Sequence, residues 1–119
     1  MNHKSNTIFW LCWVLASMLG EAVGLSAVLV VGFGVLGPRL AGLGGPWPAL
    51  LGLVAGVLLG IWEGIVVGAA QGAVLRGRLP PLSLRRWILA TVLGAMVAWG
   101  LGMLPSTLMS AEADRKSVV

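Results

Sequence analysis

Long apolar runs alternate with short polar segments along this chain. The apolar runs cover residues 8–36, 49–75 and 87–104. The segments between them, 37–48 and 76–86, contain turn-forming pairs such as Gly37-Pro38 and Pro80-Pro81. Because backbone groups in hydrocarbon must be hydrogen-bonded within the segment itself, runs of this length without a polar gap predict transmembrane helices.

These runs predict an all-α membrane protein. We expect one membrane domain over residues 1–119, with three transmembrane helices and a C-terminal tail at 105–119. At about 1.5 Å per residue the first two runs are about 40 Å long and the third about 27 Å, compared with a hydrocarbon core of about 30 Å. The two long helices are therefore expected to tilt, break or protrude, and each connecting segment to end the helix before it.

The composition agrees with a membrane location. Of the 119 residues, 58% are hydrophobic and 10% are charged, and the mean hydropathy is +0.97. A soluble domain of this size with so few polar residues could not cover itself with polar surface. The net charge is +4, but the basic residues flank the apolar runs and form no stripe interleaved with aromatic residues, which argues against nucleic-acid binding.

The basic residues also predict an orientation, because cytoplasmic loops carry an excess of Lys and Arg. The N-terminus and the second connecting segment contain Lys4, Arg76, Arg78, Arg85 and Arg86. The opposite side has Arg39, Arg115 and Lys116, the last two beside Glu112 and Asp114. We predict a multi-pass protein of the bacterial inner (cytoplasmic) membrane, with a cytoplasmic N-terminus and a C-terminus on the non-cytoplasmic side.

The first and third apolar runs share a short repeat. Residues 13–20, WVLASMLG, align with residues 87–94, WILATVLG, at an offset of 74 positions. Chance matching among apolar residues is one explanation, and a true duplication, favoured by the shared Trp, is the other. In a duplication the first and third helices would occupy equivalent places beside the second.

Glycine recurs at every fourth position of the second run, and we call this set the glycine ridge. Its members are Gly52, Gly56, Gly60, Gly64, Gly68 and Gly72. The same spacing relates Gly20 to Gly24 in the first run, and the third run contributes Gly94. Because small residues let helix backbones approach closely in a bilayer, this spacing predicts glycine-zipper packing. The glycine ridge could serve an internal three-helix bundle, another subunit, or both.

Two acidic residues lie within the apolar runs, where a carboxyl group costs about 2.5–3.5 kcal/mol on insertion scales. Counted from the predicted cytoplasmic ends, Glu21 and Glu63 both lie about 18–20 Å deep, so they could face each other near the midplane. No basic residue lies in the runs, so we expect at least one carboxyl group to be protonated. Gln71 lies two turns from Glu63 and could hydrogen-bond toward the pair. The pair is either a proton or cation site or a neutral hydrogen-bonded link between helices.

Other chemistry is sparse. The sequence has no His/Cys cluster for a metal, no nucleophile paired with a base and no phosphate-binding loop, so we predict a protein that is not an enzyme. No cofactor, metal or small-molecule substrate is predicted. A pigment held by a carboxylate, a backbone carbonyl or water, or a bound lipid, remains compatible with the sequence.

The second half of the chain resembles a group of uncharacterised small membrane proteins of cyanobacteria and Chloroflexi. The resemblance rests on the run EGIVVGAAQGAVLR at 63–76, followed by WILATVLG at 87–94. These match an E-G-x-x-x-G-x-x-Q-x-x-x-L-R helix, a short loop and a W-x-x-A-[ST]-x-x-G helix. The resemblance implies the helix–loop–helix topology and a bacterial source, and it implies no activity.

Two functions fit these features. The first is a small non-catalytic accessory or structural subunit of a larger membrane complex, photosynthetic or respiratory, with membrane lipids and other membrane-protein subunits as partners. The second is a homo-oligomeric transporter or channel in which the carboxyl pair carries a proton or cation. Few catalytic groups and much contact surface favour the first.

Overall fold

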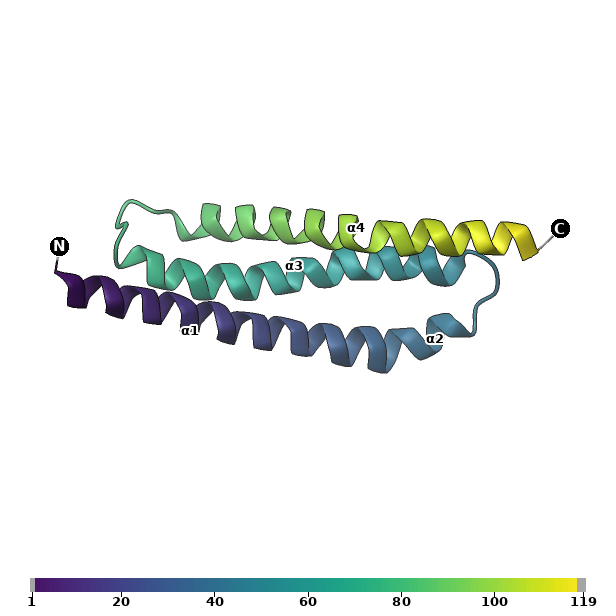
Figure 1. The fold of residues 1–119 in the computed structure, drawn as a ribbon, viewed down its shortest axis with the longest axis horizontal. Helices are drawn as coiled ribbons and strands as arrows, with labels where there is room; N and C mark the ends of the chain where they lie inside the picture. Colours follow the sequence, from purple (N-terminus) through teal and green to yellow (C-terminus); the bar gives the residue numbers. More distant parts are fainter. Residues whose placement is uncertain (1, 118–119) are drawn as a thin grey trace.

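The computed structural model describes residues 2–117 and consists of three long helical rods (Figure 1). The first rod comprises α1 (His3–Ala27), the π-helical segment η1 (Val28–Leu36) and the short α2 (Gly37–Ala41). The second is α3 (Trp47–Arg76) and the third is α4 (Leu84–Ser117). All three rods are long and apolar enough to cross a membrane, which confirms the predicted all-helical chain with three spans.

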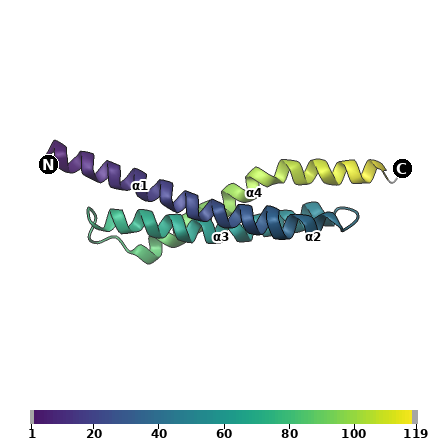
Figure 2. The same cartoon turned by 90° about the horizontal axis from the view of Figure 1, so that it is seen from below.

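The helix α3 lies in the middle. It packs against α1 on one side and α4 on the other, and α1 and α4 run parallel to each other and antiparallel to α3 (Figure 1). Seen at right angles, the N-terminal half of α1 and the C-terminal half of α4 diverge from α3 (Figure 2). The bundle measures 68 × 23 × 22 Å, so its ends extend beyond a hydrocarbon core of about 30 Å.

The first connection begins later than the sequence predicts. Gly37-Pro38 does not end the first rod, because Pro38 lies in the first turn of α2, which continues directly from η1. The chain instead turns after Ala41. Gly45 has a φ of 68°, a left-handed conformation that a residue without Cβ adopts readily.

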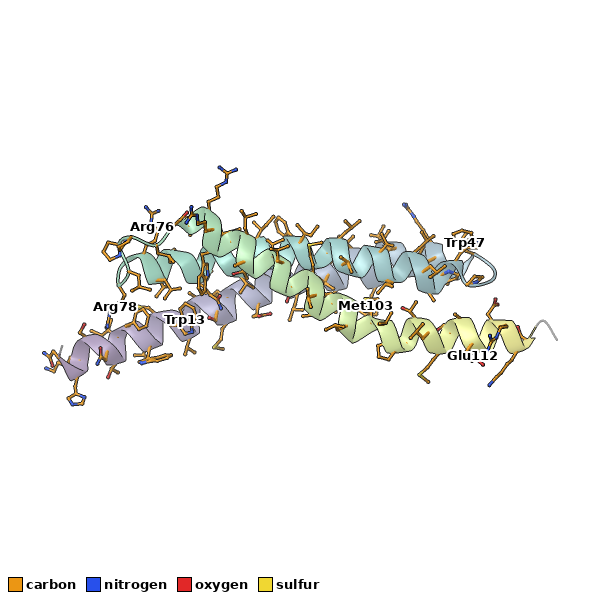
Figure 3. All side chains as sticks on the ribbon, turned by 90° about the horizontal axis from the view of Figure 1, so that it is seen from above. Trp13, Trp47, Arg76, Arg78, Met103 and Glu112 are labelled. Atoms are coloured by element: carbon orange, nitrogen blue, oxygen red, sulfur yellow. The ribbon has the colours of Figure 1, made fainter. Side chains whose placement is uncertain are left out.

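The predicted C-terminal tail is helical as far as Ser117. Pro105 lies inside α4, which bends close to Met103 (Figure 3). A proline removes one backbone hydrogen bond and kinks a helix, and here the helix continues beyond it. The Thr107 hydroxyl donates to the Met103 carbonyl at 2.9 Å, a contact that favours bending. Ion pairs from Glu112 to Arg115 and Lys116 hold the last turns.

The bundle has almost no conventional side-chain core. Val28 and Val67 are the buried hydrophobic residues recorded in the described chain, at 5% and 7% exposure, whereas Phe33 is 75% exposed and Met109 is 72% exposed. Most other buried positions are glycines of α1 and α3. The helices thus meet through backbone, and their large apolar side chains point outward, as expected for an exterior in contact with lipid.

Candidate functional site

The interface between α3 and α4 is built on four members of the glycine ridge, each opposite a larger residue. A Cβ atom added at Gly64 would lie 2.6 Å from the Cα atom of Val92, and one added at Gly60 would lie 2.7 Å from the Trp99 ring. At Gly68 the added atom would lie 3.1 Å from the Ile88 Cα atom. Gly72 faces the flexible Leu84 side chain and the Trp87 ring. Close backbone approach in the middle of this interface therefore requires glycine.

The interface between α1 and α3 uses glycines of the other helix. A Cβ atom added at Gly20 would lie 3.1 Å from the Val67 Cα atom, and one added at Gly24 would lie 3.0 Å from Glu63 Cγ. Both glycines are buried. Gly24 thus leaves room for the Glu63 side chain to pass between the two helices.

Three of the glycines named from the sequence are placed differently. Gly56 faces only the flexible side chain of Met103. Gly52 and Gly94 have nothing within 4 Å of an added Cβ atom, so a side chain at either position would meet open space. The part of α3 that packs closely against another helix is therefore shorter than the stretch over which its glycines recur.

Glu63 connects all three helices. Its Oε2 atom accepts a hydrogen bond of 2.5 Å from the Trp99 indole N–H on α4. On the α1 side, Glu63 lies beside Glu21. The structure therefore brings together the two acidic residues that the sequence placed at equal depth.

Gln71 does not reach the carboxyl pair. Its Nε2 atom donates to the Ser17 hydroxyl at 3.2 Å, which adds a second polar link between α3 and α1. Ser17 lies one turn before Glu21, and Gln71 lies two turns after Glu63. The expected orientation of Gln71 toward the pair is thus replaced by a separate hydrogen bond.

A groove of about 380 Å³ runs between α1 and α4 above α3, and we call it the carboxyl groove. Its lining includes Glu21, Glu63, Val67, Thr91, Gly94 and Ala98. Glu21 and Gly94 are exposed, so the groove is open to the surroundings of the bundle. A separate apolar cavity of about 340 Å³ lies between η1, α3 and Met103.

The end of the bundle that carries the N-terminus is held by Arg78. Its guanidinium group donates to the Ser5 carbonyl at 2.7 Å and to Asn6 Oδ1 at 3.2 Å, and it lies 4.6 Å from the centre of the Phe9 ring. Nearby, the Trp13 and Trp87 rings meet edge to face with their centroids 6.4 Å apart. Figure 3 shows Arg76, Arg78 and Trp13 toward this end and Trp47 and Glu112 toward the other. The N-terminus and the second connection therefore share one side of the bundle.

The sequence interpretation did not identify Trp99 and Ser17 as polar partners. Counting residues from the helix ends would have identified Trp99. It lies twelve residues after Trp87, and Glu63 lies twelve before Leu75, so the two are at equal depth in adjoining antiparallel helices. No sequence signal distinguishes Ser17 from other small residues in a helix.

The described residues contain no group of three or more His, Cys, Asp or Glu side chains that could hold a metal ion. The distinctive chemistry of the bundle is therefore the carboxyl pair and the groove beside it. No protein-family model, curated protein or solved structure matches this chain.

Proposed function

We propose that the chain is a small non-catalytic accessory subunit of a larger membrane complex, photosynthetic or respiratory, in the bacterial inner membrane. The observation that carries the proposal is the exposure of Glu21 in the carboxyl groove, about 18–20 Å along α1 from Ile8, where the apolar run begins. A carboxyl group facing hydrocarbon at that depth costs about 2.5–3.5 kcal/mol. A neighbouring subunit over the groove would replace lipid with a polar or closely packed surface.

The distribution of contact surface supports the same proposal. At mid-depth, a hydrogen bond between Trp99 and Glu63 links α4 to α3, and Glu21 lies beside Glu63. None of these three side chains is a nucleophile activated by a base. The small residues Gly94 and Ala98 lie beside them on an open face. Such a face suits helix–helix contact, because small residues allow close approach in lipid.

We further propose that the end carrying the N-terminus is cytoplasmic. The five basic residues Lys4, Arg76, Arg78, Arg85 and Arg86 lie at this end, and the acidic residues of α4 lie at the other. This distribution follows the excess of Lys and Arg on the cytoplasmic side. The C-terminal end of α4 would then project from the opposite face of the membrane.

The proposal is tested by purifying the tagged full-length chain from its native membrane in a mild detergent. We expect it to migrate with a heteromeric assembly much larger than the 12.3 kDa chain, at a fixed stoichiometry. Glu21→Arg, in the groove, should release the chain from this assembly. Leu93→Arg, on a face of α4 that does not line the groove, is the matched control. Migration as a monomer or a homo-oligomer would contradict the proposal.

A homo-oligomeric transporter or channel is the second candidate, favoured by one observation, that the neighbouring Glu21 and Glu63 side chains line the same groove. In that case Glu63 would carry the proton or cation. Purified chain in liposomes would then conduct protons or cations, and Glu63→Gln would abolish the flux. Absence of flux from the wild-type protein together with heteromeric migration would leave the first candidate alone.

A further inference from the structure

The end of the bundle that carries the N-terminus has positive charge that the chain itself does not balance. The basic residues at this end are Lys4, Arg76, Arg78, Arg85 and Arg86. The four acidic residues of the chain lie elsewhere, two at mid-depth and two near the C-terminus. At the C-terminal end of α4, Glu112 forms ion pairs with Arg115 and Lys116. The charge at the N-terminal end is therefore left for groups outside the chain to neutralise.

Three of these arginines gather where α3 ends and α4 begins. The residues on either side of the Arg85-Arg86 pair contact Gly72, which lies one turn before Arg76. Arg76 lies at this end of the bundle in Figure 3. Arg76, Arg85 and Arg86 are exposed, and their side chains make no hydrogen bond or ion pair with any other of residues 2–117. Their guanidinium groups are thus free to bind a ligand.

These arginines lie at the level where the apolar spans end. Arg76 directly follows Leu75, the last residue of the second apolar run, and Arg86 directly precedes Trp87, the first residue of the third. The Trp87 ring meets the Trp13 ring of α1 edge to face. Because tryptophan is enriched at the membrane–water interface, this level corresponds to the lipid headgroups.

The side of α4 that continues from Arg85 into the membrane is apolar and exposed. Leu89 and Leu93 follow Arg85 at intervals of four residues, so the three side chains lie along one side of the helix. Leu89 is 54% exposed and Leu93 is 63% exposed. They lie about 6 and 12 Å from Arg85 along the helix axis, compared with about 15 Å for half of the hydrocarbon core. A cationic group at headgroup level is thus joined to an apolar track that spans one leaflet.

We propose that this surface binds an anionic phospholipid, with its phosphate at the arginines and an acyl chain along the two leucines. We call the surface the lipid site, and it consists of Arg76, Arg85, Arg86, Leu89 and Leu93. The inference goes beyond the accessory role and does not depend on it, since it requires only the chain and a bilayer.

The choice of arginine supports phosphate as the ligand group. A guanidinium group can donate two parallel hydrogen bonds to a phosphate, whereas a lysine ammonium acts as a point charge. The excess of positive charge on cytoplasmic loops counts lysine and arginine alike, so it does not explain why four of the five basic residues at this end are arginine.

A lipid suits this surface better than a soluble acidic partner. The connection between the arginines exposes Leu79, Pro80 and Pro81, and Leu79 is 51% exposed. A soluble acidic protein would meet the charged end and leave Leu89 and Leu93 uncovered inside the bilayer. An anionic phospholipid has the negative charge and the hydrocarbon in one molecule, in the order in which the lipid site presents their partners.

The test uses the purified full-length chain, with a photoreactive amino acid in place of Leu89, in nanodiscs of phosphatidylcholine with a minor fraction of phosphatidylglycerol. Mass spectrometry of the crosslinked chain gives the ratio of phosphatidylglycerol to phosphatidylcholine adducts. We expect this ratio to exceed that of the bulk lipid at least about fivefold, the effect of about one basic residue near an anionic lipid surface. Arg76→Gln, Arg85→Gln and Arg86→Gln together should return it to the bulk ratio. Arg39→Gln, at an exposed arginine of the opposite end, is the control and should preserve the enrichment.

Leu108 provides a matched probe position, because it is 60% exposed and lies four residues before Glu112, as Leu89 lies four residues after Arg85. A photoreactive residue there should report the bulk ratio. The bulk ratio at position 89 of the otherwise wild-type chain would overturn the inference, and so would enrichment that survives the triple substitution. Equal enrichment at both positions would also overturn it, because the lipid would then follow the net charge of the chain. None of these results bears on heteromeric migration, which tests the proposed function separately.

Discussion

The Trp99 indole N–H donates a hydrogen bond of 2.5 Å to Glu63 Oε2 across the α3–α4 interface. The same carboxyl group contacts Glu21 on α1, so one acidic side chain joins three helices at mid-depth. A polar group surrounded by hydrocarbon is tolerated when its hydrogen bonds are made within the protein. This contact therefore gives Glu63 a structural role whether or not the pair also exchanges a proton.

Trp99→Phe is expected to destabilise the bundle by about 1–2 kcal/mol, because it removes the donor and leaves the carboxylate oxygen without its partner. Chemical unfolding in mixed micelles, followed by circular dichroism, measures the change. Trp62→Phe is the control, because Trp62 is 45% exposed and its indole N–H has no hydrogen-bond partner among residues 2–117. Equal stability of the two variants would show that the hydrogen bond contributes nothing.

Gly64→Ala is expected to be the most damaging alanine substitution in the glycine ridge. The new Cβ would lie 2.6 Å from the Val92 Cα atom, so a helix backbone must move, at a cost of about 1–3 kcal/mol. Gly52→Ala, where nothing lies within 4 Å, should stay within about 0.5 kcal/mol of the wild type. Thermal unfolding of both variants in the same detergent provides the comparison, and a reversed order would refute the packing described for Gly64.

The Gln71–Ser17 hydrogen bond should be measurable as a coupling between α1 and α3. A double-mutant cycle with Ser17→Ala and Gln71→Leu is expected to give about 0.6 kcal/mol, the average for interhelical hydrogen bonds in a bilayer protein. A cycle pairing Ser17→Ala with Trp99→Phe is the control and should be additive. Additivity in both cycles would mean that the 3.2 Å contact is not stabilising.

Arg78→Ala should loosen the N-terminal turns of α1, because the Arg78 side chain binds the Ser5 carbonyl and the Asn6 side chain. Hydrogen exchange of the amides over residues 3–9 is expected to rise, with exchange in α3 unchanged. Arg85→Ala is the control, since Arg85 is exposed in the first turn of α4. Unaltered exchange at the N-terminus would show that Arg78 does not hold it.

The number of helices and the equal depth of Glu21 and Glu63 follow from the sequence, since both depend on apolar run length and a rise of about 1.5 Å per residue. The helix ends do not follow as well. Gly37-Pro38 and Pro105 resemble stop signals. A proline ends a helix, however, only when no interactions stabilise the helix beyond it. The residues after Pro105 form ion pairs at helical spacing and continue α4.

The side-chain partners could be predicted only in part. Glycine spacing indicates that α3 approaches its neighbours closely. It does not distinguish Gly64, where an added Cβ would meet Val92, from Gly52, where an added Cβ would meet open space. That difference arises because the C-terminal half of α4, which runs beside the N-terminal end of α3, diverges from α3 (Figure 2). Helix crossing is a tertiary property that a four-residue spacing in one helix does not determine.

Site-specific photo-crosslinking in the native membrane tests most directly whether a neighbouring subunit covers the carboxyl groove. A photoreactive amino acid is placed at Ala98, which lines the groove, and in a matched variant at Leu93, which is 63% exposed on a different face of α4. From position 98 we expect a discrete protein adduct. It should differ from a crosslinked dimer of this chain, either by a mass above twice that of the chain or by containing a different polypeptide. From position 93 we expect lipid adducts. Lipid adducts alone at both positions would contradict the proposal that this chain is a subunit docked through its groove.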